Sequence, residues 1–502
     1  MKKITLFLLL LTLTAFSQEK YILKTGLPDM TVGDMLKHAD SLFNPETNFS
    51  FNCTTNYLLP YDKIAKDPGS KPGYADDQLK LIAKDSLQPF AYGNLGLYYE
   101  NKGEGELARQ YYTKALEKVK YMKVEKDSAK VYSYKGYLKF HLGEDGGPDM
   151  EKAITINKKD SLAVCFYPMY LITSQKYEQA EKVLVRVLED DNNKYFGYLM
   201  LYMSKAFDAI GKSTAAADGD MGKAFAQFDV QTFVDMRPYQ KYFKKSDEDF
   251  VLLREMSDMF GVTIKMLGTL QDKNHKLAAA DLALVEKKEQ FFKSRLKKKN
   301  ANLYGLYMSL GTTSMAKRDF AAAVDYFQKA IDDFPVEKES VTFNRLDAYY
   351  NIATIHIYLK EYDKALAVLK TVPDTPVLPP NTKAKALLDM GKLYYLKNDP
   401  ETAADYADQS LSITESFEGD MFLGYMYIRQ KLNTIGMRYS EKAQKLSYTP
   451  DNLSTTVNYY MVLHIANGNF DEAVNIYEGN KELIAGNCKS CEYLIKHYLV
   501  AK

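Results

Sequence analysis

Two cysteines late in the chain form its most obvious chemical motif. Cys488-Lys489-Ser490-Cys491 is a CxxC pair, which can close a short disulfide or, at a helix start, carry a thiol of low pKa. A thioredoxin-like redox site needs a preceding strand in a βαβ context, which the flanking residues do not supply. A structural zinc site needs two more ligands at a recognised spacing. We therefore predict a structural disulfide between Cys488 and Cys491, with redox activity and metal binding as the alternatives.

The rest of the chain lacks the usual patterns of catalysis. Its six histidines are isolated, and there is no HExxH motif, no phosphate-binding glycine loop and no Ser or Cys in a nucleophile-elbow context. Acidic residues are abundant, but nothing in the sequence singles out a pair for acid–base work. We predict no catalytic residue, no metal and no cofactor, and hence a protein that is not an enzyme.

The net charge of the chain gives no overall electrostatic attraction to nucleic acid or to an anionic membrane. Lys and Arg number 66 against 65 Asp and Glu, which leaves a formal net charge of +1. One basic stretch, residues 293–299, follows Glu286 and Glu289 on the same predicted helix. Basic residues late in a helix favour its negative end. We interpret the stretch as a solvated helix terminus and predict no nucleic-acid partner.

The first residues resemble a targeting segment. Lys2 and Lys3 precede an apolar run from Ile4 to Leu13, and small residues before Gln18 fit a signal-peptidase site. The run is too short for a membrane span of about 20 residues. We expect residues 1–17 to be a cleaved signal peptide, and the mature chain to be soluble without a transmembrane segment, in the periplasm, at the outer membrane or outside the cell.

The elements that must position any site are set by a repeated pattern. Small and aromatic residues recur at fixed offsets along the chain with a period of about 34 residues, which is typical of stacked helical repeats. The clearest copy consists of Tyr307, Leu310, Gly311, Ala323, Phe327, Ala330 and Pro335.

In this order of residues the chain resembles the tetratricopeptide repeat family and is similar to its exported bacterial members. The first unit carries the family's order of aromatic, Leu-Gly, Tyr, Ala, aromatic and Ala: Tyr92, Leu95, Gly96, Tyr99, Ala108, Tyr112 and Ala115. In a third unit Pro168 falls inside the first helix, so we expect that helix to be kinked or to start late. The resemblance implies an all-α fold, a helical-repeat solenoid of helix-turn-helix units.

A second, stronger array follows in the C-terminal part. We mark each unit by its Leu-type residue, and these markers are separated by 42, 38, 33 and 37 residues: Leu310, Ile352, Met390, Leu423 and Tyr460. The expected organisation is a signal peptide (1–17), an irregular N-terminal extension (18–88), an N-terminal array (89–193), a helical bridge or degenerate repeats (194–300), a C-terminal array (301–490) and a capping helix (491–502).

The resemblance also predicts a binding surface, because such a stack exposes first-helix side chains on its concave face. In the C-terminal array these are Met308, Thr312, Tyr350, Thr354, Tyr358, Lys385, Lys392, Tyr395, Tyr425 and Arg429. Tyr and Met suit an extended peptide or a partner helix. The alternative is that several of these positions are buried by neighbouring repeats.

The family's five-residue carboxylate clamp is not predicted. Asn351 and Lys385 match two of its positions, but Met308, Thr312 and Asp389 occupy the other three. We therefore expect an exported, non-catalytic scaffold or adaptor that binds a protein or peptide segment on the concave face. The alternatives are a glycan- or nutrient-binding envelope protein, which the absence of Trp disfavours, and a thiol redox protein using Cys488 and Cys491. The oligomeric state is left open.

Overall fold

The structure is a computed structural model of the 502-residue chain. It describes residues 21–23, 73–102, 104–122, 128–189, 194–216, 234–271, 277–298, 301–340, 344–445, 450–466, 468–482, 484 and 488–501. The chain divides into two compact units. The inserted unit is Phe49–Thr382, and the terminal unit combines Met1–Asn48 with Lys383–Lys502. The predicted signal peptide and the rest of the extension before Gly73, apart from residues 21–23, lie outside the described residues.

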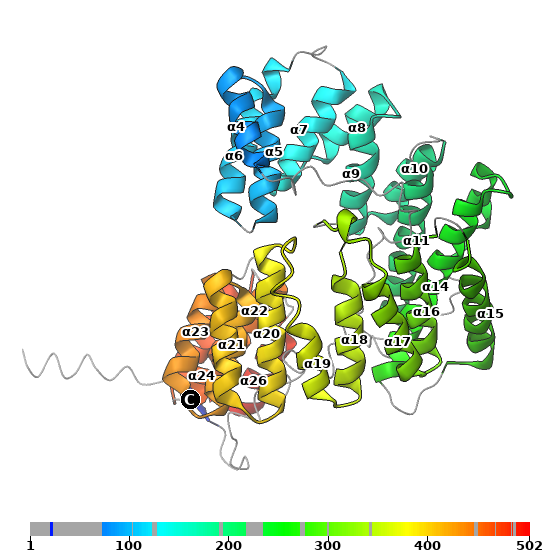
Figure 1. Ribbon diagram of the computed structural model, residues 1–502. Coiled ribbons are helices and arrows are strands. Elements are labelled where there is room, and N and C mark those ends of the chain that lie inside the picture. The colour runs from blue at the N-terminus through cyan, green and yellow to red at the C-terminus, as the bar shows by residue number, and fades with distance from the viewer. Residues whose placement is uncertain are drawn as a thin grey trace, which may run out of the picture. The chain divides into compact units, whose positions relative to one another are not determined.

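The inserted unit begins with antiparallel helix pairs that follow one another along the chain (Figure 1). Its first helices are α4 (Tyr74–Lys84), α5 (Pro89–Asn101), α6 (Gly105–Lys118), η5 (Val119–Tyr121), α7 (Ala129–His141), α8 (Gly147–Ile156), α9 (Ser161–Thr173) and α10 (Tyr177–Leu188). The structure differs from the expected irregular extension at α4, which carries Tyr74, Gln78 and Ile82 four residues apart on the side that is less exposed. Gln78 accepts a hydrogen bond from Asn94 of α5 at 3.1 Å, so α4 is docked on the first pair.

Pro168 lies inside α9, which starts at Ser161 and runs unbroken to Thr173. The helix therefore does not start late. Asp160 caps its first turn by accepting a hydrogen bond from the Ala163 amide at 3.0 Å.

In its described residues, the middle of the inserted unit contains three longer helices and one short 3-10 helix, η6. These are α11 (Lys194–Ala216), η6 (Arg237–Tyr242), α14 (Glu248–Gln271) and α15 (Ala279–Arg295). α11 packs on α10, while α14 and α15 both pack on α16 (Leu303–Ala316), the first helix of the next array. The described part of the predicted bridge is thus mainly helical, and α14 and α15 pack on the array that follows.

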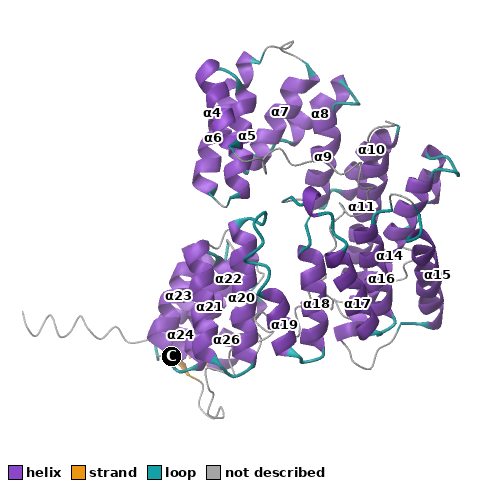
Figure 2. Cartoon of the chain, viewed as in Figure 1, coloured by secondary structure: helices purple, strands orange, loops and turns teal. Residues whose placement is uncertain are grey.

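The remaining pairs continue the pattern into the terminal unit. They are α16 with α17 (Phe320–Asp332), η7 (Val336–Lys338), α18 (Leu346–Tyr358) with α19 (Tyr362–Leu369), α20 (Pro380–Leu396) with α21 (Pro400–Ile413), α22 (Phe417–Arg429) with α23 (Asn433–Lys445), and α24 (Pro450–Ala466) with α25 (Phe470–Asn480). Helix α26 (Lys489–Tyr498) and strand β2 (Leu499–Ala501) follow, and β2 pairs with β1 (Tyr21–Leu23). Apart from this two-stranded sheet, the described elements are helices (Figure 2), and the predicted all-α helical-repeat class is confirmed.

The same turn joins the two helices of successive pairs. One residue in each turn has a positive φ between 56° and 79°: Gly143, Gln175, Arg318, Lys360, Asn398, Lys431 and Gly468. The amide after it donates to a carbonyl five residues back, as from Asp319 to Ser314 at 2.9 Å and from Leu432 to Tyr427 at 2.8 Å. This is the Schellman ending of a helix. The last five of these residues each follow their predicted marker by eight residues, so the spacing predicted from the sequence is the spacing observed.

Within a pair, the helices approach closely where the marker is followed by glycine. In α16 a Cβ on Gly311 would lie 2.5 Å from the ring of Phe327, which is fully buried on α17. In α22 a Cβ on Gly424 would lie 3.1 Å from Ser440 Oγ and 3.3 Å from the Gly436 carbonyl. The aromatic ring fills the contact in the first pair, whereas in the second the two backbones themselves come together.

Candidate functional site

The repeat register fixes which first-helix positions belong to the predicted concave face. They lie five and two residues before each marker and two, five or six residues after it. We call these the inner positions. Their exposure decides whether the predicted face is open to a partner.

In the inserted unit, the inner positions of α16 and α18 are closed except at Tyr358. Met308 and Thr312 are 2% and 9% exposed, in a helix that contacts α14 and α15 as well as its partner α17. Tyr350 and Thr354 of α18 are each 6% exposed. Tyr358 is half-buried and accepts a hydrogen bond from Arg318 at 3.2 Å.

In the terminal unit, the inner lysines take part in a chain of ion pairs. Lys385 is exposed and lies 2.8 Å from Asp389, while Lys392 is buried between Asp389 at 3.5 Å and Glu418 at 2.5 Å. The ammonium groups of both lysines are thus paired with carboxylates of their own unit. An external carboxylate would have to compete with Asp389 for them.

The inner aromatic residues of the terminal unit pack against one another. Tyr425 is 5% exposed, with its ring 5.8 Å from that of Tyr395, which also meets Phe422 edge-on at 6.1 Å. The side chain of Arg429 lies outside the described residues. The structure therefore buries Met308, Thr312, Tyr350, Thr354, Lys392 and Tyr425, and leaves Tyr358, Lys385 and Tyr395 partly or fully accessible.

Three inner positions are open in the N-terminal array, which lies outside the predicted site. Phe90 and Leu97 on α5 are 38% and 40% exposed, and Met169 on α9 is 44% exposed. Phe140 on α7 and Phe166 on α9 are half-buried beside them. Applying the marker offsets to Leu95 and Tyr167 would have selected Phe90, Leu97 and Met169. We call Phe90, Leu97, Phe140, Phe166 and Met169 the open inner face.

Buried aromatic contacts hold this open inner face in place. The ring of Phe90 lies 4.6 Å from that of Tyr134, whose hydroxyl donates to the Pro89 carbonyl at 3.1 Å. Tyr137 meets Phe166 edge-on at 4.9 Å. Burial raises the pKa values of Tyr134 and Tyr137, so both hydroxyls stay protonated. The exposed rings are therefore supported by rigid neighbours rather than by loops.

A polar cluster joins α5, α6 and α7 at this face. Glu100 Oε2 accepts a hydrogen bond from the Tyr112 hydroxyl at 2.5 Å and lies 2.8 Å from His141 Nδ1. Burial opposes the charged carboxylate, but the bonds from His141 and Tyr112 outweigh it and lower the pKa of Glu100. The His141 ring is stacked 4.6 Å from Tyr112. This cluster fixes the first pair against the second.

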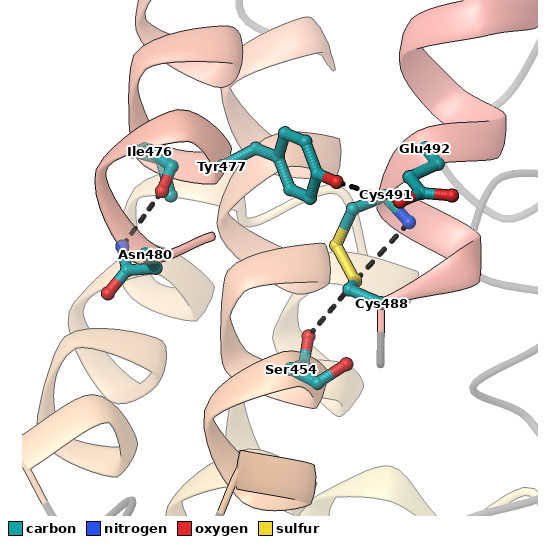
Figure 3. Close-up of a disulfide and its surroundings, with 7 residues drawn as sticks. All are labelled: Ser454, Ile476, Tyr477, Asn480, Cys488, Cys491 and Glu492. Carbon is teal, nitrogen blue, oxygen red and sulfur yellow. Dashed lines mark hydrogen bonds between the residues drawn. A yellow bond between two sulfur atoms is a disulfide. The ribbon is translucent and has the colours of Figure 1, made fainter. Parts of the chain in front are cut away.

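The structure joins Cys488 and Cys491 by a disulfide at the start of α26 (Figure 3). Both cysteines are buried, at 1% and 0% exposure, and Cys488 Sγ accepts the Cys491 amide at 3.3 Å as the N-cap of the helix. A buried disulfide gives an external thiol little access. That its role is structural stays a prediction.

The basic stretch of α15 is occupied by ion pairs within the inserted unit. Arg295 and Lys298 lie 3.3 and 2.5 Å from Glu248, and Lys293 lies 2.8 Å from Glu289. Among the described residues there is no group of three or more His, Cys, Asp or Glu suited to a metal. Nor does any described helix combine the length and apolarity needed to cross a membrane.

Comparison with known proteins identifies the repeats. Residues 91–117, 304–332 and 346–372 match the tetratricopeptide repeat model. These segments are the pairs α5–α6, α16–α17 and α18–α19, all in the inserted unit. No curated protein matches the chain in sequence.

Solved structures of low similarity include the yeast Tom70 and the human IFIT1 dimer with PPP-AAAA. Tom70 has a TM-score of 0.33 and 13% identity, over 84% of this chain and 91% of that one. The IFIT1 structure has a TM-score of 0.31 and 16% identity, over 84% of this chain and 96% of that one. Tandem helix pairs of this family serve in general as protein-binding scaffolds.

Proposed function

We propose that this protein is an exported, non-catalytic scaffold that binds an apolar segment of another protein on the open inner face. The observation that carries the proposal is the exposure of Phe90, Leu97 and Met169 at inner positions of α5 and α9. Exposed apolar groups gathered on one face are typical of contact sites. Export is proposed from the targeting pattern of residues 1–17.

The chemistry of the face favours a partner segment with two or three large apolar side chains. Phe and Met offer broad contact surfaces that adapt to more than one shape. The Glu100–His141 pair adds a polar rim at which a main-chain or side-chain donor can bind the free oxygen of the carboxylate. Lys385, Tyr395 and Tyr358 form the accessible remainder of the sequence-predicted face and are proposed as secondary contacts in their own units.

The proposal is tested by photocrosslinking the mature protein to its partners in the native envelope. The variant Phe90→Ser, Leu97→Ser and Met169→Ser should lose the crosslinked partner while its circular dichroism spectrum stays unchanged. A matched control replaces exposed apolar residues outside the inner positions, Tyr121→Ser and Ile156→Ser, which are both 47% exposed. The control should retain the partner.

A second variant separates the two candidate faces. Tyr350→Ala, Tyr395→Ala and Tyr425→Ala removes three aromatic residues of the sequence-predicted face, of which Tyr350 and Tyr425 are buried. Partner loss in this variant alone, with both proteins folded, would move the site to the later helices and contradict the assignment to α5–α9.

A further inference from the structure

The last helix of the terminal unit is fastened at both ends. Helix α26 has ten residues, fewer than an isolated helix needs to be stable in water. It buries Cys491 and Leu494 on one side and exposes Tyr493 (46%) on the other. Tyr477 of α25 donates to Glu492 at 3.0 Å (Figure 3). The disulfide and the N-cap Cys488 fix the start of α26. The C-cap of the helix, Leu499, is also the first residue of β2.

Strand β2 is paired with a segment from the far end of the sequence. The register is antiparallel, with Tyr21 opposite Ala501, Ile22 opposite Val500 and Leu23 opposite Leu499. Two strands of three residues have too little pairing to be stable alone. Their support comes from α25, which contacts β1, and from the burial of Leu499 (5% exposed).

Removing β1 would leave the main chain of β2 as a free edge. Its amide and carbonyl groups would lose their partners, and such an edge binds any extended segment of matching register. Main-chain hydrogen bonds supply the affinity in this kind of strand addition.

We propose that the edge of β2 is a strand-binding site that residues 21–23 occupy in cis, and that this pairing keeps α26 and its disulfide closed. The ligand class is an extended peptide with the register of residues 21–23. The inference is independent of the open inner face, because it involves only the terminal unit. If the edge of β2 is occupied in this way, the Cys488–Cys491 disulfide is protected from reductant both by the pairing of β1 with β2 and by helix α26, whose start the disulfide forms.

The test is the rate at which dithiothreitol reduction followed by iodoacetamide labels Cys488 and Cys491 in the full chain, read by mass spectrometry of that peptide. Tyr21→Gly, Ile22→Pro and Leu23→Gly should speed labelling about tenfold, because local opening controls access. The matched control places the same three substitutions at Gln18, Glu19 and Lys20 and should label like the wild type. Equal rates in the strand variant and the control would overturn the proposal.

Adding a peptide of residues 18–26 in trans tests the site itself. It should restore slow labelling to the strand variant, whereas a scrambled peptide should not. If both peptides act alike, the edge of β2 is not a sequence-matched strand site.

If the strand variant fails to fold, an engineered disulfide tests whether residues 21–23 pair with β2 in the full chain. In a chain with Cys53→Ser and Cys165→Ser, the pair Ile22→Cys and Val500→Cys should form a disulfide, because directly opposed residues in an antiparallel pair lie within its reach. The control pair is Ile22→Cys with Glu401→Cys, on exposed α21 surface. Equal crosslinking of the two pairs would contradict the register.

Discussion

The helix pairs α16–α17 and α22–α23 have the same connecting turn, but different residues fill the contact between their two helices. In both pairs a left-handed residue, Arg318 or Lys431, ends the first helix in a Schellman turn. Seventeen residues after the marker, however, α17 has Phe327 and α23 has Ser440. One pair is spaced by a ring, and the other is closed by direct approach of the backbones around Gly424 and Gly436.

The residue at this position also varies among the other helix pairs. It is aromatic in two of the matched pairs (Tyr112 and Phe327) and in α25 of the terminal unit (Tyr477). It is Leu369 in the third matched pair, and Ala407 and Ser440 in α21 and α23. A stacked tyrosine pair bridges the two helices in at least one pair of each unit: Tyr99 with Tyr111, and Tyr427 with Tyr439. The turn is therefore shared by the pairs, whereas the contact between their helices is filled by an aromatic ring in α16–α17 and by close backbones in α22–α23.

Removing the aromatic ring of Phe327 should have the largest effect on stability. Phe327→Ala is expected to destabilise α16–α17 by about 3–5 kcal/mol. It leaves a cavity, and the turn between the two helices prevents them from moving together to fill it. Hydrogen exchange of these helices in increasing guanidinium measures the loss. Val336→Ala, at a residue that is 61% exposed in the same unit, serves as the control. A loss below about 1 kcal/mol would mean that the ring does not space the helices.

Adding an aromatic ring to α21 should be nearly as harmful. Ala407 is fully buried, and a Cβ on Gly391 would already lie 2.9 Å from the Ala403 carbonyl. Ala407→Phe should cost about 3 kcal/mol through overpacking of α20–α21. Gln409→Phe, on the exposed side of α21, controls for added apolar surface. Stabilisation by Ala407→Phe would reveal an unfilled volume and break the comparison.

Lowering the pH should change the stability contributed by one buried carboxyl group in each unit, and the two changes should have opposite signs. Burial raises the pKa of Asp420 to about 6, with Lys442 opposing and Glu415 adding to the shift. Against an unfolded value of about 3.9, the folded terminal unit binds more protons, so its stability falls as pH rises from about 4 to 6. Glu255 of the inserted unit is the reverse case. Burial opposes its charge, but bonds from Lys288 and Arg254 lower its pKa, so its contribution is lost as pH falls below about 4.3.

The corresponding variants separate these contributions. Asp420→Asn should stabilise the terminal unit at pH 7 by an amount on the order of 2 kcal/mol and leave it unchanged near pH 4. Glu255→Gln should destabilise the inserted unit at pH 7, because it removes one of the carboxylates paired with the buried Lys288. Unit-resolved hydrogen exchange between pH 4 and 8 measures both. Equal pH profiles of wild type and Asp420→Asn would show that Asp420 titrates normally.

The smallest effect should be the same in both units. Lys360→Gly and Lys431→Gly relieve a left-handed backbone at φ 61° and 63°, and each should stabilise its helix pair by about 0.5 kcal/mol after the entropic cost of glycine. Thermal denaturation of each single variant measures the gain. A gain in one unit and a loss in the other would show that the two turns are not equivalent.

Much of the fold was predictable because its rules are local. The markers from Leu310 to Tyr460 placed the turns of the later pairs, since helix length and the left-handed ending depend on neighbouring residues. Helix α4 was missed because its face is partly polar, with Gln78 at the contact. The candidate site was predicted less well. Thr312 and Tyr425 were assigned to an open face by register, but exposure depends on what else packs there, and α14 covers α16 from outside its own pair.

The sequence by itself determined the class of fold and the register of the repeats, because a spacing of small and large residues dictates how two adjacent helices meet. The tertiary structure alone decided which inner positions remain open, that residues 21–23 close the terminal unit against residues 499–501, and that the chain divides at Thr382. These are contacts between segments far apart in sequence, and no local pattern encodes them.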